Sequence, residues 1–365
     1  MTYLLERPPA LLFGVPVDDV TMDEAVAAIG RLVASGRRQR RTHQVATVNV
    51  DFLVNAETDH SNRALLQAAD LSIADGMPIL WGARSAGMPL RERVSGADLV
   101  PALAGRAGPE GWHIHLFGSS PGTAEAAAEL LRGRFPGARI TADSGPIISD
   151  VSAVDEDVLT RITSLDPDIL CVALGNPKQE RFIANNRDRL RTPVMIGVGG
   201  TFDLLIGDKK RAPVWVQRIG LEWVVRVAQE PRRLAQRYAR DAWIFFPRLV
   251  TELRVLRREH RSTRGTVQID VAGRNVTISP SPNAHGDEGG WETAAAALYA
   301  GSTLVLSLHD CPALKVRDLA VLVGMARIAR REGAAISVGA IGPRLAEQMR
   351  SLKLDAFVDR RADMG

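Results

Sequence analysis

The stretch Ala69-Asp-Leu-Ser-Ile-Ala-Asp-Gly-Met-Pro-Ile-Leu-Trp-Gly82 shows the pattern on which the rest of the chain is built. Leu71-Ser-Ile-Ala74 is predicted to be a short buried strand, Asp75-Gly76 breaks it, and a helix is predicted to begin at Met77. A carboxylate at such a break lies at the carboxyl end of a strand, where open α/β folds bind their ligands. Turn residues also cap helices, so Asp75 is either a site residue or only a cap.

Length and cysteine usage indicate a globular protein with more than one domain. A chain of 365 residues is longer than one typical domain, so two are expected. Cys171 and Cys311 give neither a disulfide framework nor a metal-ligand spacing, which suits a reducing cytoplasm. We expect no signal peptide, because the first residues show no basic segment followed by a long apolar core. We expect no membrane span, because no stretch approaches roughly 20 uninterrupted apolar residues.

The order strand, turn, helix recurs along the first part of the chain. It is repeated in residues 44–50, 113–126, 167–180 and 195–203. Strands that alternate with helical stretches predict a doubly wound, mostly parallel α/β sheet. Polar residues from several strand ends should then converge at the carboxyl edge of that sheet. These residues are Thr47, Asn49, Asp75, Gln179 and Asp203.

Capping signals and apolar spacing predict the elements before residue 70. Residues 11–17 are expected to form one strand. Thr21-Met-Asp-Glu24 matches a capping box, which should begin a helix that ends near Ser35. The basic residues 36–41 are expected to form a solvated loop, and residues 51–69 a single helix.

The junction in residues 113–126 joins a strand to a helix through a Gly/Ser turn. Its free backbone N–H groups and positive helix end would suit a diphosphate. The junction is not a G-x-G-x-x-G motif, so neither a nicotinamide cofactor nor a dehydrogenase is supported. His113 and His115 alternate on the strand and are expected to be structural.

Residues 209–262 form a strongly basic region in which arginines are mixed with Trp, Phe and Tyr. Three interpretations are open for these amphipathic helices. They could be a membrane-surface element drawn to anionic lipid, a lid whose guanidinium groups hold a diphosphate, or a nucleic-acid patch. The first two are compatible and both are favoured, whereas no recognition motif supports nucleic acid as a partner.

Several ordered motifs resemble those of the WecG/TagA/CpsF glycosyltransferases over roughly residues 11–255. They are Thr47-x-Asn49, Ala74-Asp-Gly76, Glu92-Arg-Val-Ser-Gly-Ala-Asp98, Phe117-Gly118, Gly175-Asn-Pro-Lys-Gln-Glu180, Gly197-Val-Gly-Gly-Thr-Phe-Asp203, Arg211-Ala-Pro213, Leu221-Glu-Trp223, Arg226 and Glu230-Pro-Arg-Arg233. The resemblance implies an inverting transferase with a Rossmann-like core, which moves a sugar from a UDP-sugar to a polyprenyl-diphosphate-linked acceptor in bacterial surface polysaccharide synthesis. The sugars implied are N-acetylmannosamine, its uronic acid or glucuronic acid. The resemblance also implies a peripheral protein on the inner, cytoplasmic face of the cell membrane.

The same resemblance assigns roles to individual residues. Asp75 would be the catalytic base, which takes the proton of the acceptor hydroxyl as that hydroxyl attacks the anomeric carbon. Thr47, Asn49 and Gln179 would orient sugar hydroxyls, and Arg93 would lie near the donor diphosphate or the acceptor. The other residues implied to bind substrate are Gly118, Asn176, Lys178, Gly199, Asp203, Arg226, Arg232, Arg233 and Arg237.

The leaving UDP carries charge that must be stabilised, and many sugar transferases use a metal held by an Asp-x-Asp motif for this. Asp166-Pro-Asp168 matches the letters but precedes its strand, at the amino edge of the sheet, and Asp155-Glu-Asp157 is predicted to begin a helix. We therefore expect no metal and no other cofactor, with arginines of the basic region in the cation's role. The alternative function is a UDP-sugar-binding platform with a regulatory C-terminal region.

After a linker at residues 260–265, the chain resembles a STAS domain over about 100 residues. Such domains often carry a phosphorylatable Ser or Thr where the helix after the central strand begins. Ala313-Leu-Lys-Val-Arg-Asp318 has neither, which favours a protein-binding or self-associating module over a phosphorylation switch. The predicted organisation is a Rossmann-like core in residues 1–208, a basic appendage in 209–262 and a STAS-like domain in 263–365.

Overall fold

The chain folds into two units in the computed structural model. The structure describes residues 7–146, 148, 150–151, 153–207, 212–213, 216, 222–229, 231–262, 266–281, 290–309, 311 and 313–357. The larger unit comprises Val20–Leu80 and Arg91–Trp243, and the smaller unit comprises Met1–Asp19, Trp81–Leu90 and Ile244–Gly365. Each unit therefore collects segments that are far apart in the sequence, and the domain boundaries at residues 208 and 262 stay a prediction.

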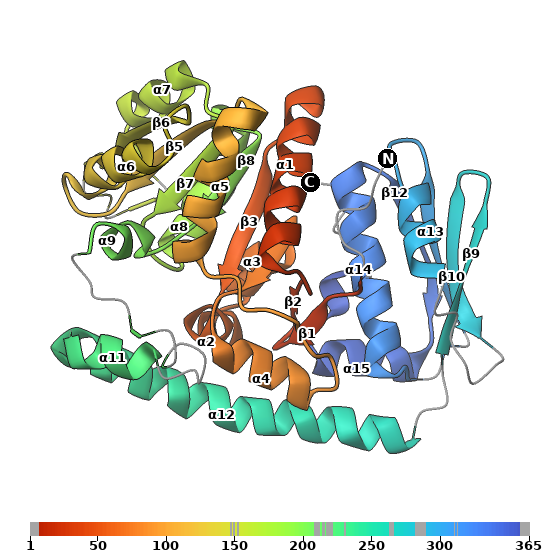
Figure 1. Ribbon diagram of the computed structural model, residues 1–365. Coiled ribbons are helices and arrows are strands. Elements are labelled where there is room, and N and C mark those ends of the chain that lie inside the picture. Colours follow the sequence, from red (N-terminus) through yellow and green to blue (C-terminus); the bar gives the residue numbers. More distant parts are fainter. Residues whose placement is uncertain are drawn as a thin grey trace. The chain divides into compact units, whose positions relative to one another are not determined.

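Six strands form the sheet of the larger unit (Figure 1). In the order in which they lie side by side they are β4 (Leu71–Ala74), β3 (His43–Val48), β8 (Val194–Gly197), β7 (Ile169–Ala173), β5 (His113–Gly118) and β6 (Arg139–Asp143). Every neighbouring pair is parallel, so all six carboxyl ends lie at one edge. This architecture confirms the predicted α/β class with a mostly parallel sheet.

Helices cover both faces of this sheet. One face carries α1 (Met22–Gln39), α5 (Gly96–Glu110) and α6 (Thr123–Arg134), and the other carries α3 (His60–Gln67), α7 (Glu156–Leu165) and α8 (Lys178–Leu190). Three shorter helices, α2 (Val50–Thr58), α4 (Met77–Ser85) and α9 (Thr201–Leu205), begin close to the ends of β3, β4 and β8. The carboxyl edge is thus lined by strand ends and helix beginnings.

The amino end of α1 confirms the predicted capping box. Thr21 Oγ1 accepts from the Glu24 N–H at 3.3 Å, and Glu24 Oε2 accepts from the Thr21 N–H at 2.9 Å. The predicted end near Ser35 and the predicted basic loop are wrong, because the helix continues to Gln39. Arginines in the last turn suit the negative end of the helix dipole, so this basic run continues the helix.

Two further predictions for the amino-terminal segment are wrong. The single helix over residues 51–69 is divided, because Asp59 has an extended backbone and its side chain accepts from the Ser61 N–H at 2.8 Å, which begins α3. Residues 11–17 form a hairpin of β1 (Ala10–Leu12) and β2 (Val15–Val17). Phe13 and Gly14 both have positive φ, 55° and 75°, which makes a two-residue turn.

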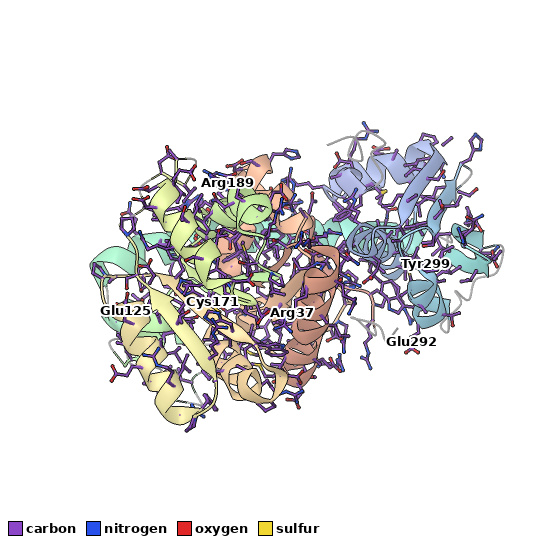
Figure 2. All side chains as sticks on the ribbon, turned by 90° about the horizontal axis from the view of Figure 1, so that it is seen from above. Arg37, Glu125, Cys171, Arg189, Glu292 and Tyr299 are labelled. Carbon is purple, nitrogen blue, oxygen red and sulfur yellow. The ribbon has the colours of Figure 1, made fainter. Side chains whose placement is uncertain are left out.

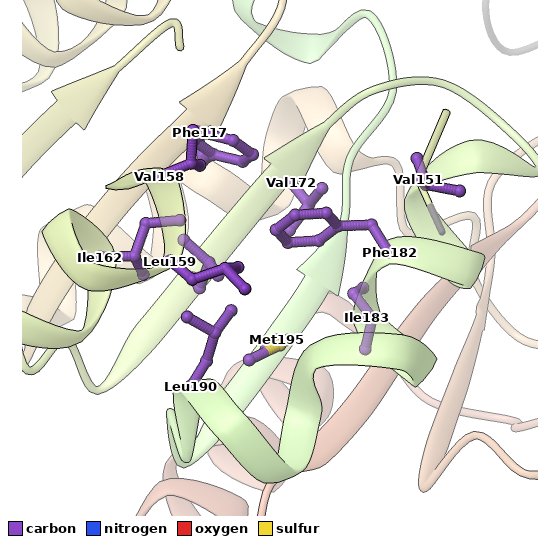
Figure 3. Close-up of a cluster of buried hydrophobic side chains, with 11 residues drawn as sticks. Phe117, Val151, Val158, Leu159, Ile162, Val172, Phe182, Ile183, Leu190 and Met195 are labelled. Carbon is purple, nitrogen blue, oxygen red and sulfur yellow. The ribbon is translucent and has the colours of Figure 1, made fainter. Parts of the chain in front are cut away.

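A cluster of eleven buried apolar side chains joins α7 and α8 to the sheet (Figure 3). Phe117 on β5 and Phe182 on α8 stack at its centre, with ring centroids 5.3 Å apart. Leu159 and Ile162 of α7 and Met195 of β8 belong to the same cluster. This packing fixes where α8 begins relative to the ends of β7 and β8.

Cys171 lies inside the sheet on β7 (Figure 2) and is fully buried. Burial raises the pKa of its thiol to about 12, so the thiol stays protonated and behaves as a small apolar group. Cys311 is also a free, buried cysteine. Neither residue has the exposed, electropositive surroundings of a reactive cysteine.

The two histidines of β5 are structural, as predicted. His113 Nε2 and His115 Nδ1 each lie 2.8 Å from Thr141 Oγ1 on the adjacent strand β6. Burial lowers the pKa of both rings, and that of His115 falls to about 4. Both imidazoles are therefore neutral at physiological pH and serve to join β5 to β6.

The smaller unit contains a second, four-stranded sheet. Its strands lie in the order β12 (Ala335–Ile341), β11 (Thr303–Leu308), β10 (Asn275–Ser281) and β9 (Thr266–Ala272). The β9–β10 pair is antiparallel, and the two other pairs are parallel. Its helices are α13 (Gly290–Ala297), α14 (Val316–Glu332) and α15 (Pro343–Ser351). A smaller α/β domain is present here, while its STAS-like nature stays a prediction.

The hairpin β1–β2 and the carboxyl part of α12 (Pro231–Ser262) belong to this smaller unit. The Phe13 N–H donates to both carboxylate oxygens of Glu252 on α12, at 3.0 and 3.1 Å. Asp18, which follows the hairpin, binds the Arg327 guanidinium of α14 through two hydrogen bonds of 2.7 and 3.1 Å. Both partners of this ion pair are buried.

The basic region forms α11 (Glu222–Gln229) and the long helix α12. The predicted helices are therefore present. Among the described residues, we find no helix that combines the length and the apolar character needed to cross a membrane.

Replacement of Arg327 by Met should destabilise the smaller unit by about 3–5 kcal/mol, because the substitution removes the guanidinium that pairs with the buried Asp18 carboxylate. Urea unfolding would measure the loss, and hydrogen exchange of residues 10–17 would locate it. Arg106→Met is the matched control, since its ion pair with Glu110 is exposed and should contribute less than about 1 kcal/mol. An equal effect of both substitutions would show that the buried pair does not hold the hairpin.

Candidate active site

The carboxyl edge of the six-stranded sheet brings the predicted polar residues together on neighbouring strands. Asp75 follows β4, Thr47 lies near the end of β3, and Gln179 lies in the first turn of α8 after β7. The Asp75 N–H donates to the Val48 carbonyl at 2.8 Å, which ties the end of β4 to the end of β3. The side chain of Asp75 is partly exposed at this edge.

Gln179 is held by hydrogen bonds at both ends of its amide. It is 1% exposed. Its Oε1 accepts from the Gly199 N–H at 2.9 Å, and its Nε2 donates to Glu180 Oε1 at 2.8 Å. The structure therefore joins two predicted site residues, Gln179 and Gly199, by a hydrogen bond. It also adds Glu180 to the site, a residue that was predicted only as the last position of a family motif.

Gly197, the last residue of β8, makes room for this pair. A Cβ at Gly197 would lie 2.7 Å from Glu180 Oε1 and would also overlap the amide of Gln179. The Gly197 carbonyl accepts from Thr47 Oγ1 at 2.8 Å, so the Thr47 hydroxyl proton is used by the backbone. Thr47 can then offer a ligand only its lone pairs.

Asn49 differs from its predicted position. We expected it at the end of a strand, but β3 ends at Val48 and Asn49 is the N-cap of α2. Its Oδ1 accepts from the Phe52 N–H at 3.4 Å. A cap at the strand end still places the residue at the carboxyl edge, with a different side-chain direction.

Asp51, in the first turn of α2, joins the basic helix α12 to this edge. Arg237 Nη2 lies 2.6 Å from Asp51 Oδ2, and Arg237 Nε lies 3.2 Å from Asp51 Oδ1. Asn176 Nδ2, in the turn before α8, donates to Asp51 Oδ2 at 2.9 Å. Sequence reasoning named Arg237 and Asn176 but missed Asp51; its position two residues after Asn49 in the first turn of a helix was the available signal.

Two carboxyls next to Asp51 resist ionisation. Burial raises the pKa of Glu180 to about 8, and the negative charge of Asp51 acts in the same direction. Burial and Asp51 together raise the pKa of Asp241, on α12, to about 6. Asp51 itself forms an ion pair with Arg237.

The remaining predicted residues lie around the same edge. Arg93, before α5, lies 3.3 Å from Glu222 of α11 and 3.5 Å from Asp98. Gly118 ends β5 with a φ of 94°, and the next residue, Ser119, donates to Asp203 at 3.5 Å. Lys178 Nζ lies 3.5 Å from the Ile148 carbonyl.

Three predicted arginines have side chains outside the described part of the structure. Arg226 belongs to α11, and Arg232 and Arg233 belong to the first turn of α12. Their contribution to the site stays a prediction.

The two Asp-x-Asp sequences are placed as predicted, one at the amino edge of the sheet and the other at the beginning of a helix. Asp168 accepts from the His113 N–H at 2.8 Å and from Arg37 Nε at 2.6 Å, at the amino edge of the sheet. Asp155 is the N-cap of α7. In the part of the chain that the structure describes, no group of three or more His, Cys, Asp or Glu side chains has the arrangement of a metal site.

Comparison with known proteins adds two findings. The model of the glycosyl transferase WecG/TagA/CpsF family matches residues 10–259. The N-acetylglucosaminyldiphosphoundecaprenol N-acetyl-beta-D-mannosaminyltransferase of Bacillus spizizenii is 28% identical over 246 residues, which cover 67% of this chain and 91% of that protein. The matched region contains all the site residues above.

Replacement of Gly197 by Ala should destabilise the larger unit by about 1–3 kcal/mol, because the added Cβ overlaps the Gln179–Glu180 pair. The matched control is Gly200→Ala, where the nearest atom to a new Cβ is Asp203 Oδ2 at an ordinary 3.6 Å. Urea midpoints of the two variants would be compared with that of the unmodified protein. Equal midpoints for the two variants would mean that the space at Gly197 is not needed.

Proposed function

Because the chain belongs to the WecG/TagA/CpsF family of glycosyltransferases, we propose that it moves a sugar from a UDP-sugar to a polyprenyl-diphosphate-linked acceptor with inversion at the anomeric carbon. The donor sugar would be N-acetylmannosamine, N-acetylmannosaminuronic acid or glucuronic acid, and the product would enter a bacterial surface polysaccharide. The Bacillus spizizenii relative is named as a mannosaminyltransferase that acts on a diphosphoundecaprenol-linked sugar. Its name supports this choice of donor and acceptor.

The observation that carries the proposal is the convergence of Asp75, Thr47 and Gln179 at the carboxyl edge of one parallel sheet. Inversion by direct displacement needs one base on the side of the sugar opposite the leaving UDP. Asp75 has the position and partial exposure for that role, whereas Glu180 is buried and holds its proton. Thr47 and Gln179 would position hydroxyl groups of the donor or the acceptor.

The proposed reaction needs no metal. Negative charge on the leaving UDP would be stabilised by arginines of α11 and α12 together with Arg93. The ion pair between Arg237 and Asp51 holds the first part of α12 at the carboxyl edge. This contact supports a role for α12 at the reaction centre. Exclusion of water by these helices would favour transfer over hydrolysis.

We also propose that α12 contacts the cytoplasmic face of the membrane. Trp243, Phe246 and Val250 are 82%, 57% and 45% exposed at helical spacings of three and four residues. Exposed Arg240 and Arg254 lie beyond the two ends of this apolar stripe. An apolar stripe with flanking arginines is typical of helices that lie in the interface of an anionic bilayer.

The C-terminal domain would serve a protein partner or a second copy of the chain. Its sequence lacks a phosphorylatable residue in 313–318, and its sheet ends in the edge strands β9 and β12. These contacts would be a second function beside sugar transfer, and the domain would contribute no catalytic residue.

Asp75→Asn should lower the transfer rate by about 10²–10⁴-fold, since the amide cannot accept the hydroxyl proton. The measurement is UDP release from a panel of UDP-sugars with a polyprenyl-diphosphate-sugar acceptor, in EDTA, with nuclear magnetic resonance of the product anomer. Asp188→Asn, an exposed aspartate on α8, is the control.

Transfer that survives Asp75→Asn would remove Asp75 as the base. Loss of activity in EDTA that returns with a divalent cation would overturn metal independence. Tight binding of a UDP-sugar with no transfer to any acceptor would instead favour the regulatory platform.

Trp243→Glu and Phe246→Glu should each weaken binding to vesicles that contain phosphatidylglycerol by about tenfold or more, because each removes roughly 1.5–3 kcal/mol of apolar burial. Cosedimentation would measure the loss. Thr251→Glu introduces the same charge on α12 at an exposed position away from the stripe, and it should bind nearly as well as the unmodified protein. Equal losses in all three variants would mean that charge alone causes the effect and that the stripe is not the contact.

A further inference from the structure

Glu180 is buried beside the proposed site, although the chemistry proposed above gives it no task. It is 2% exposed, and its Oε1 accepts from Gln179 Nε2 at 2.8 Å. Its Oε2 is buried and has no hydrogen-bond partner among the residues that the structure describes. Burial of a carboxyl with one unsatisfied oxygen lowers stability, so a packing role alone would be served better by an apolar side chain.

The amide of Gln179 has two separate anchors. The Gly199 N–H must meet an acceptor, which fixes Oε1 of Gln179 on that side. Glu180 accepts one of the two protons on Nε2 on the other side. With both anchors in place, the second Nε2 proton has no hydrogen-bond partner within the described part of the chain.

The charges around Glu180 favour its neutral form. Burial raises its pKa to about 8, and Asp51 on α2 adds to the effect. Arg237 of α12 is engaged by Asp51, and the carboxyl of Asp241 on the same helix is itself buried. The two cations nearest to it in the sequence of α8 are directed elsewhere, Lys178 to the Ile148 carbonyl and Arg181 to Asp59 and Asn62.

From this geometry we propose that Glu180 is a positioning residue, whose buried carboxylic acid holds the amide of Gln179 in one orientation so that an Nε2 proton is presented to the substrate. The inference rests on the proposed function, because it assigns the substrate contact to the same site. Glu180 does not touch the reacting atoms and acts only through Gln179. The space for the carboxyl exists because residue 197 is glycine.

Hydrogen exchange tests the positioning without any need for activity. In Glu180→Ala, Gln179 loses one anchor, so exchange of the Gly199 N–H should accelerate by about tenfold or more. Glu180→Gln keeps an acceptor of the same shape and should leave this exchange nearly unchanged. Asn186→Ala is the control, because Asn186 is a buried polar residue of the same helix that bonds only within α8 among the described residues. Unchanged exchange of Gly199 in Glu180→Ala would overturn the proposal.

The unfolding equilibrium tests the protonated state. The folded-state pKa of about 8 exceeds the ordinary value of 4.5, so the unmodified protein loses stability as the pH rises from about 5 to 8. The Glu180→Gln side chain does not titrate. The urea midpoint of this variant should therefore exceed that of the unmodified protein by a margin that grows as the pH rises from about 5 to 8. A margin independent of pH would show that Glu180 is charged in the folded state.

The kinetic test separates positioning from a structural effect. Glu180→Ala should lower kcat/KM by about tenfold or more while Asn186→Ala does not, and Glu180→Gln should restore the rate. Glu180→Gln should also remove any fall in rate of the unmodified enzyme above pH 8. An inactive Glu180→Gln variant would overturn the proposal, because a neutral acceptor would then be insufficient. If the unmodified protein transfers no sugar, the proposed function fails, and the exchange and stability measurements still decide the role of Glu180.

Discussion

The missing side chain at Gly197 is the constraint on which the carboxyl edge depends. The strand β8 lies between β3 and β7, and its last residue must leave room for side chains that arrive from α8. Gln179 and Glu180 fill this room, and Thr47 binds the Gly197 carbonyl from the other side. One glycine thus allows groups from β3, β8 and α8 to meet, which a Cβ at this position would prevent.

The alternation of strands and helices, the class of fold and the place of Asp75 directly after a strand could be predicted because they depend on local patterns. Short apolar runs that end in Gly or Asp predict parallel strands, and the capping box at Thr21 is itself a local hydrogen-bond pattern. The division of the helix at Asp59 and the turn at Phe13 were missed, because both depend on the backbone angles of single residues.

The proposed role of Glu180 could not be predicted, because it arises from burial. In the sequence Glu180 belongs to a polar run, Lys178-Gln-Glu-Arg181, that is typical of an exposed helix. Packing of α8 on the sheet places this carboxyl in the interior, while Arg181 one position further binds Asp59 at the surface. The tertiary structure, and not the sequence of the helix, therefore determines which ionisable side chain of α8 is buried and has a shifted pKa.

The ion pair between Asp18 and Arg327 has a consequence for how the chain is made. Its two residues are 309 positions apart, so a ribosome that adds 5–20 residues per second completes the second partner on the order of 15–60 s after the first. During that time the β1–β2 hairpin has no α14 to bury it. A helix that is synthesised much later thus completes the packing of a hairpin made early in synthesis.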